Sequence, residues 1–258
     1  MTLNTLMGGE ERMPLLLALI ARENPDVLVL QECLGWEDGE RLGQVAAALG
    51  LPATEAHVRL GWARPRPSGN RYHVAVVSRP PVRSARAHND ARVIGHCLLE
   101  CALETEAGPL TLFAAHFDSH HEDLRLAEAR DVLARLDPAA FASGAFLLAG
   151  DLNALSRADP YPGDLAERVR RAGLDKYGHP PRFDVLDALT GFGWVDALRR
   201  RPASSRWVTA PRERQGERLE LRTDYVLASP RLAERLLGAD VVDVGAASDH
   251  HALCATFT

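Results

Sequence analysis

The residues best suited to chemistry are Asp151 and Asn153, which follow an apolar run that ends at Gly150. A short apolar run closed by glycine is typical of a strand covered on both faces, and open α/β sheets place polar groups at the carboxyl ends of such strands. On a strand, side chains two residues apart point to the same side. A carboxylate there can bind a metal or orient a water, and a carboxamide can donate an N–H to a phosphate oxygen. Gly-Asp-x-Asn is also a good turn sequence, so this stretch alone leaves both interpretations open.

Polar groups of the same kinds stand at the ends of other predicted strands, namely Asn4, Glu32, His116, Asp224, Asp249 and His250. Carboxylate and amide oxygens suit Mg²⁺ or Mn²⁺, which keep waters and bind phosphate oxygens. Histidines suit the acid–base and charge-stabilising work of phosphoryl transfer. The structural alternatives are that Asn4 merely ends a strand and that His116 is a satisfied strand-end histidine. Glu32 follows four apolar residues, where a charge without a function would be expensive to keep.

Short motifs occur in a fixed order along almost the whole chain: Asn4, Pro25-Asp26-Val27 with Gln31-Glu32, Val76-Val77-Ser78-Arg79, His116-Phe117-Asp118, Gly150-Asp151-Leu152-Asn153, Gly193-Trp194-Val195-Asp196-Ala197, Thr223-Asp224-Tyr225-Val226-Leu227 and Ser248-Asp249-His250. Each motif is weak by itself, but the ordered set is specific. In these residues the chain resembles the endonuclease/exonuclease/phosphatase superfamily, whose members include deoxyribonuclease I, abasic endonucleases, sphingomyelinases and inositol polyphosphate phosphatases.

The resemblance implies an α/β four-layer sandwich, in which two mixed β-sheets pack face to face between flanking helices and the site lies at one rim. A length of 258 residues with 46% hydrophobic content is compatible with one domain over residues 1–258. The resemblance also implies that Glu32 is the main carboxylate of an Mg²⁺ or Mn²⁺ site, assisted by Asn4 and Asp249.

By the same resemblance, five polar residues carry the catalysis. Asp151 would orient or deprotonate the attacking water, and Asn153 would hold a phosphate oxygen. His250 would hydrogen-bond the phosphate, with Asp224 fixing its tautomer as the orienting carboxylate of a triad does. His116 would stabilise the charge that develops on the phosphoryl oxygens.

Two departures from the family pattern bear on this expectation. His73 stands where many members have a glycine before the following strand. Cys33-Leu34-Gly35 follow Gln31-Glu32, where abasic endonucleases commonly carry Thr-Lys. The second departure argues against the specificity of an abasic endonuclease.

Two arginine-rich segments suggest a polyanionic substrate. Residues 59–92 contain eight arginines and one acidic residue, and residues 199–222 contain eight arginines and three glutamates. Arginine makes the bidentate contacts that suit phosphate, so Arg71, Arg79 and Arg222 are predicted to bind substrate. The alternative is a solvated surface in a protein that uses arginine in place of lysine, since Lys176 is its only lysine. The net charge of −5 argues against coating of nucleic acid in bulk.

The elements that must position these residues follow from apolar periodicity and turn signals. Besides the run before Asp151, strands are predicted at 2–6, 26–31, 73–78, 91–105, 110–116, 218–228, 241–244 and 252–257. Helices are predicted from Met13 to before Asn24-Pro25, over 37–49, after a capping box of Ser119 with Glu122, over 165–172 and over 183–189. Strands that interleave with a few helices favour packed mixed sheets with the helices outside.

The chain shows no signal peptide and no membrane span, and its four cysteines show no CxxC pairing. We therefore expect a reducing, cytoplasmic location without disulfides, and no obligate protein partner is evident.

Several alternatives remain open. The cluster His116, Asp118, His120 and His121 invites comparison with metallo-β-lactamase-type zinc hydrolases, but its order is His-x-Asp-x-His-His. Calcineurin-like phosphoesterases need a later Gly-Asn-His, which is absent. One fold can host several functions. The alternatives are therefore a phosphomonoesterase or sphingomyelinase-like phospholipase of the same fold, and a non-catalytic module that binds anions or a partner. The sequence favours a metal-dependent phosphodiesterase that hydrolyses DNA or RNA by in-line attack of an activated water.

Overall fold

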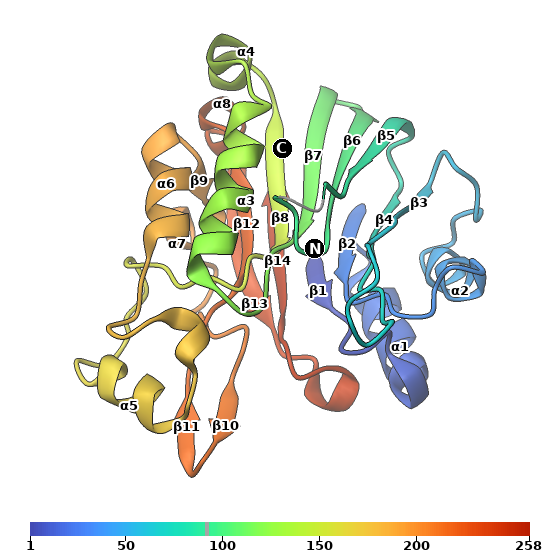
Figure 1. Ribbon diagram of the computed structural model, residues 1–258. Coiled ribbons are helices and arrows are strands. Elements are labelled where there is room, and N and C mark those ends of the chain that lie inside the picture. The colour runs from blue at the N-terminus through green and yellow to red at the C-terminus, as the bar shows by residue number, and fades with distance from the viewer. Residues whose placement is uncertain (91–92) are drawn as a thin grey trace.

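A computed structural model describes residues 1–90 and 93–258 and contains two six-stranded mixed sheets (Figure 1). The first sheet has the order β13-β14-β1-β2-β4-β3, with bounds Leu236–Val242, Ala252–Phe257, Thr2–Asn4, Val27–Gln31, Val74–Ser78 and Val58–Gly61. The second has the order β5-β6-β7-β8-β12-β9, with bounds Val82–His88, Cys97–Thr105, Gly108–His116, Phe146–Asp151, Asp224–Ala228 and Val195–Asp196.

Helices cover the outer face of each sheet. In Figure 1, α1 (Met13–Glu23) and α2 (Glu40–Ala48) lie on the side of the first sheet, and α3 (Glu122–Ala134), α4 (Pro138–Ser143) and α6 (Asp184–Phe192) lie on the side of the second. Four shorter helices are η1 (Glu10–Arg12), α7 (Ala197–Arg200), α8 (Pro230–Ala233) and η3 (Gly245–Ala247). Of these, α7 places Ala197 and Leu198 in the core between the two sheets. The arrangement is the predicted four-layer α/β sandwich.

The layers form because successive side chains of a strand point to opposite faces and enter different cores. In β2, Val29 lies between the two sheets, whereas Leu28 and Leu30 pack against α1 and α2. In β8, Ala149 lies between the sheets and Leu148 packs against α3 and α6. Both strands are therefore covered on both faces, as their continuous apolar runs predict.

A smaller unit, here called the side lobe, projects from one end of the sandwich and is visible at the lower left of Figure 1. It consists of α5 (Leu165–Arg171), the short helix η2 (Asp175–Tyr177) and the hairpin of β10 (Arg212–Arg214) with β11 (Glu217–Leu219). These elements share their own apolar core, formed by Leu155, Leu165, Val169, Ala172, Leu174, Tyr177, Ala210, Leu219 and Leu221. The lobe is thus a packed body and not a loose excursion.

Most predicted elements lie where the sequence places them, and the strand predicted at 252–257 is β14. The strand predicted at 91–105 begins only at Cys97, and residues 91–92 of that prediction lie outside the described residues. The capping box of Ser119 with Glu122 is wrong. α3 begins at Glu122 with His121 as its N-cap and no side-chain capping bond. The Asp118 carboxylate instead accepts the backbone N–H groups of His120 and His121, which turns the chain into the helix.

Among residues 1–90 and 93–258, none of the helices combines the length and apolar character needed to cross a bilayer. All four cysteines are free thiols, and Cys33, Cys97 and Cys101 are buried.

Candidate active site

The register of three adjacent strands brings together the polar residues at their ends. β7 runs parallel to β8 and pairs His116 with Asp151, while β12 runs antiparallel to β8 and pairs Asp224 with Asp151. In the facing sheet, β1 and β2 are parallel and pair Asn4 with Gln31, so that Glu32 follows at the same rim. Residues more than 200 positions apart in sequence thus meet at one end of the sandwich.

Gly150 permits the close approach that positions Asp151. Its φ is 147°, and a Cβ at this position would lie 1.9 Å from the carbonyl oxygen of Ala115 in β7. Any side chain would push β8 away from β7 and separate Asp151 from His116. The glycine of the Gly-Asp-x-Asn motif is therefore required by packing as well as by backbone conformation.

The carboxylates of Glu32 and Asp151 accept from the same amide. Asn4 Nδ2 donates to Glu32 Oε1 and to Asp151 Oδ2, each at 3.2 Å, and its Oδ1 accepts the Leu6 N–H at 2.9 Å. Glu32 Oε2 accepts the Met7 N–H at 2.9 Å. Glu32 has a φ of 56°, in the left-handed region that non-glycine residues seldom occupy. This backbone conformation turns its carboxylate from the end of β2 toward Asp151.

Asp224 orients His250 on the other side of Asp151. His250 Nδ1 lies 2.8 Å from Asp224 Oδ2, and the Asp224 and Thr223 N–H groups donate to Thr209 Oγ1. Burial lowers the pKa of His250, but the Asp224 and Asp151 carboxylates outweigh burial and raise it to about 9. Burial also raises the pKa of Asp224. At neutral pH the pair therefore carries one proton more than an ionised Asp224 with a neutral His250 would carry.

Asp151 Oδ2 lies between two imidazoles, 3.8 Å from His250 Nε2 and 3.9 Å from His116 Nε2. Burial raises the pKa of Asp151, but His250, His116 and Lys176 outweigh burial and hold its pKa below the usual value. Asp151 is only 2% exposed, and its Oδ1 accepts the Asn153 N–H at 2.8 Å. It is thus an ionised carboxylate at the centre of the cluster.

His116 is part of a parallel stack that the sequence did not reveal. Its ring lies on that of His96, with centroids 4.2 Å apart and an angle of 3° between the planes. Burial lowers the pKa of His96, and His116 and Arg66 lower it further. Burial also lowers the pKa of His116, and the Asp151 and Glu32 carboxylates do not fully offset this effect. His116 Nδ1 is buried without a hydrogen-bond partner. A neutral His116 can offer a hydrogen bond to a phosphoryl oxygen without repelling a neighbouring cation.

Asn153 reaches the site by a different route from the one predicted. β8 ends at Asp151, and Asn153 lies beyond it with a left-handed φ of 50°, so the two residues do not share one face of a strand. Asn153 Nδ2 donates to the Phe117 carbonyl at 3.2 Å, and Oδ1 accepts from Lys176 Nζ at 2.9 Å. The strand interpretation therefore holds as far as Asp151, and the chain leaves the strand before Asn153.

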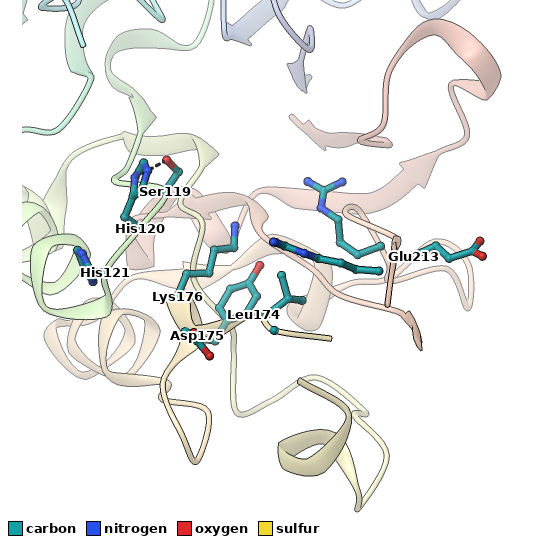
Figure 2. Close-up of a pocket in the computed structure, with 11 residues that line it drawn as sticks. Ser119, His120, His121, Leu174, Asp175, Lys176 and Glu213 are labelled. Atoms are coloured by element: carbon teal, nitrogen blue, oxygen red, sulfur yellow. Dashed lines mark hydrogen bonds between the residues drawn. The ribbon is translucent and has the colours of Figure 1, made fainter. Parts of the chain in front are cut away.

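These groups open into a cavity of about 710 Å³. Its lining includes five predicted residues, namely Glu32, His116, Asp151, Asn153 and His250. It also includes residues that the sequence did not single out as site residues, among them Arg66, Tyr72, His96, Lys176 and Arg212. A second hollow of about 490 Å³ adjoins it and shares Ser119, His120, His121, Lys176 and Arg212 with it (Figure 2).

The structure places the remaining predicted residues elsewhere. Asp249 is 43% exposed in its side chain and pairs with Arg212 at 2.9 Å. Arg222 is fully buried between Asp159 and Asp196, where it ties the fold together. Arg79 follows Ser78, which pairs with Val27 at the opposite end of β2 from Glu32. Arg71 is half-buried and lines neither cavity. Counting arginines did not show which rim each side chain reaches.

The donor set fits a hard divalent cation. Asp151, Asp224 and His250 offer ligand atoms within 4.8 Å of one another, but Asp224 and His250 already bond each other and Asp224 does not line the cavity. We favour Glu32 with Asp151, because both carboxylates line the cavity and converge on one Asn4 amide. Carboxylate oxygens with room for water are the ligands that Mg²⁺ and Mn²⁺ take.

Glu128 of α3 fixes the two segments that carry the stacked histidines. Its Oε1 accepts the Gly95 N–H at 2.7 Å and its Oε2 accepts the Asp118 N–H at 2.6 Å. Burial raises the pKa of Glu128 to about 8, although both N–H groups oppose the rise. The folded protein therefore keeps a proton that the unfolded chain releases above its normal carboxyl pKa.

Because the folded protein retains the Glu128 proton, we expect its stability to depend on pH. Because the folded pKa lies above the unfolded one, the contribution of Glu128 is fully present below about pH 4.5 and is lost as the pH rises to about 8. Glu128→Gln cannot ionise, so the difference in melting temperature between wild type and this variant should shrink over that range. Glu234→Gln, at an exposed position, should leave the wild-type slope unchanged. A constant difference from pH 5 to pH 8 would contradict the prediction.

Comparison with known proteins bears on the family and the fold. Residues 1–250 match the endonuclease/exonuclease/phosphatase family. A family member from Leptotrichia buccalis has a TM-score of 0.68 at 14% identity, covering 100% of this chain and 98% of that one. A 3′ phosphatase from Neisseria bound to product DNA hairpin has a TM-score of 0.68 at 21% identity, with coverages of 100% and 98%. An AP endonuclease from Archaeoglobus fulgidus has a TM-score of 0.66 at 17% identity, with coverages of 99% and 97%.

No curated protein shows a significant sequence match. At these identities the solved structures establish the fold, and the match over residues 1–250 establishes the family. The chain belongs to the endonuclease/exonuclease/phosphatase family.

Proposed function

We propose that this protein is a divalent-metal-dependent phosphodiesterase that hydrolyses DNA or RNA by in-line attack of water. The observation that carries the proposal is the position of Asp151 Oδ2. It lies 3.8 Å from His250 Nε2 and 3.9 Å from His116 Nε2, shares the Asn4 amide with Glu32, and faces the 710 Å³ cavity. A buried carboxylate among proton-bearing groups is suited to phosphoryl transfer, which depends on positioning and charge stabilisation.

Asp151 orients the attacking water and accepts its proton, since its pKa lies below the usual value and keeps it ionised. His250, oriented through Nδ1 by Asp224, presents Nε2 toward the phosphate. Asn153 has one Nδ2 hydrogen bonded to the Phe117 carbonyl and a second hydrogen available for a phosphate oxygen. His116 stabilises the charge that develops on the phosphoryl oxygens as a neutral donor.

Glu32 and Asp151 would hold the Mg²⁺ or Mn²⁺ ion, with Asn4 fixing the distance between their carboxylates. A bound ion supplies Lewis acidity and neutralises charge on the phosphate. Asn4 faces these carboxylates with its amide nitrogen, so its role here is to position them and not to act as a ligand. Asp249, which the resemblance also assigns to the metal, would have to leave Arg212 to take part.

Nucleic acid is the preferred substrate for two reasons. Three cationic side chains, Arg66, Lys176 and Arg212, line the cavity beside the catalytic cluster. The structural neighbours include a 3′ phosphatase bound to product DNA hairpin and an AP endonuclease. A chain of phosphates can occupy the adjoining hollow while one phosphate lies at Asp151.

The test uses purified, chelator-treated protein with Mg²⁺, Mn²⁺, Ca²⁺ or Zn²⁺ added back. Substrates are labelled single- and double-stranded DNA, RNA, bis-p-nitrophenyl phosphate, p-nitrophenyl phosphate and sphingomyelin. We expect Mg²⁺ or Mn²⁺ to restore cleavage of nucleic acid and of the diester. Turnover of the monoester or of sphingomyelin alone would replace the assignment with a phosphomonoesterase or phospholipase. Absence of turnover with every ion would leave a binding module, and rescue by Zn²⁺ alone would favour a zinc hydrolase.

A further inference from the structure

We propose that Lys176 and Arg212, both carried by the side lobe, form a cationic clamp that binds the phosphate group of the substrate. The proposal rests on the proposed function, because it assigns two substrate-binding residues to the same site. Neither residue belongs to a strand of the two sheets. Each contacts a residue that is expected to face the phosphate, Lys176 through Asn153 and Arg212 through His250.

The side lobe holds both cations in a fixed relation to the site. Glu217 of β11 bonds Arg171 at 2.6 Å and Arg168 at 3.5 Å, which ties the hairpin to α5. Thr209, just before β10, accepts the Asp224 N–H through its side chain and the His251 N–H through its carbonyl at 2.7 Å. The segment that leads into the hairpin is therefore bonded to the backbone of Asp224 and of His251, the residue after His250.

Lys176 is the only lysine of the chain and points into the region where the two hollows meet. Figure 2 shows its side chain extending from η2, with Ser119 and His120 above it. Its Nζ donates to Asn153 Oδ1 at 2.9 Å and lies 4.9 Å from the Tyr177 ring. An ammonium has three donors, so Lys176 can keep Asn153 in place and still donate to a phosphate oxygen.

Arg212 contacts His250 Nε2, the ring nitrogen that is expected to hydrogen-bond the phosphate. One guanidinium nitrogen donates to Asp249 Oδ2 at 2.9 Å, and the other contacts His250 Nε2 at 2.6 Å. Because the guanidinium lies 2.6 Å from Nε2, it stands where a phosphate oxygen would have to lie to accept from the Nε2–H. The two contacts exclude each other. When a phosphate binds, Arg212 leaves Nε2, and the freed N–H groups can bind the phosphate while the first nitrogen stays on Asp249.

The third cationic side chain of the cavity, Arg66, contacts residues other than Asn153 and His250. Its guanidinium lies within 3.3 Å of polar atoms of His96, Ser119 and His120 and 3.8 Å from Asp118. Lys176 and Arg212 are therefore the cations placed nearest the phosphate-facing residues Asn153 and His250. The compact charge of a lysine ammonium and the bidentate hydrogen bonds of an arginine guanidinium are together suited to binding phosphate.

The experiment compares Lys176→Met and Arg212→Met with Arg218→Met. Arg218 lies on the same hairpin but pairs with Glu213, one position out of register with Arg212, so it is exposed and lines neither cavity. For bis-p-nitrophenyl phosphate and a short single-stranded DNA, we expect each of the first two variants to raise KM about tenfold or more and to lower kcat by a smaller factor, since Lys176 also holds Asn153 in place. The inhibition constant of inorganic phosphate should rise by the same factor. Arg218→Met should change neither constant.

Arg212→Lys and Lys176→Arg should recover part of the lost affinity, because they restore the charge without the original geometry. Melting temperatures show whether each variant is folded. An unchanged KM and inhibition constant in both methionine variants, with an active wild type, would overturn the clamp. So would a loss of kcat alone. If the wild type shows no turnover, the proposed function fails, and calorimetric titration with inorganic phosphate still decides whether the clamp exists.

Discussion

Asp151→Asn is expected to lower kcat by at least about 10³-fold, the largest effect of any single substitution in this protein. The change removes the negative charge that lies 3.8 Å from His250 and 3.9 Å from His116, and with it the acceptor for the proton of the attacking water. It also removes one of the two carboxylates that share the Asn4 amide. The side-chain volume is nearly unchanged, so the fold should persist. Steady-state turnover of a diester at saturating Mn²⁺ measures the effect.

The control for this variant is Asp164→Asn. Asp164 is exposed and stands at the start of α5 without a side-chain capping bond, so its charge can be removed without consequence for the site. Its kcat should stay within about twofold of wild type. Residual activity of Asp151→Asn within tenfold of wild type, at an unchanged melting temperature, would show that another group activates the water.

Asp224→Asn is expected to lower kcat by about 10²-fold. Asp224 accepts from His250 Nδ1 at 2.8 Å, and its carboxylate is the main reason that the pKa of His250 rises to about 9. Protonated His250 is the form that can donate Nε2–H to phosphate, so wild-type activity should be present below this pKa and lost as the pH rises through it. Without the carboxylate the pKa of His250 falls, and the loss should move to lower pH. A pH–rate profile of both proteins tests this.

Asp243→Asn provides a matched control, because Asp243 also faces a histidine, His251, at 3.6 Å on the surface. It should leave both kcat and the alkaline limb of the profile unchanged. If Asp224→Asn shifts the acidic limb instead, or leaves the profile unchanged with a lower kcat, His250 is not the group that must be protonated.

The fold was predictable because local signals agreed with one another along the chain. Continuous apolar runs identified β2 and β8 as strands covered on both faces, and each strand does place side chains in two different cores. The convergence of His116, Asp151 and Asp224 depends on strand register, which the ordered motifs implied but which no local pattern determines.

The sequence did not show that residues of the side lobe line the cavity. Lys176 and Arg212 are 36 positions apart and reach the site only because α5, η2 and the hairpin share a core. His96 is a single histidine before a strand, and it belongs to the site because it stacks on His116 across two paired strands. Conversely, Arg222 was predicted to bind substrate, because charge counting gives no information on burial. It is in fact fully buried, since Asp159 and Asp196 neutralise it inside the protein.

At Glu32 the left-handed backbone makes thermal stability and function oppose each other. This conformation disfavours an L side chain by roughly 1 kcal/mol, a cost that glycine would avoid, whereas asparagine adopts the left-handed φ found at Asn153 more readily. A mutant library screened only for survival after heating should therefore become enriched in glycine in place of Glu32. Such survivors would keep the sandwich while lacking a carboxylate at its rim, so heat selection on this scaffold has to be coupled to a turnover assay.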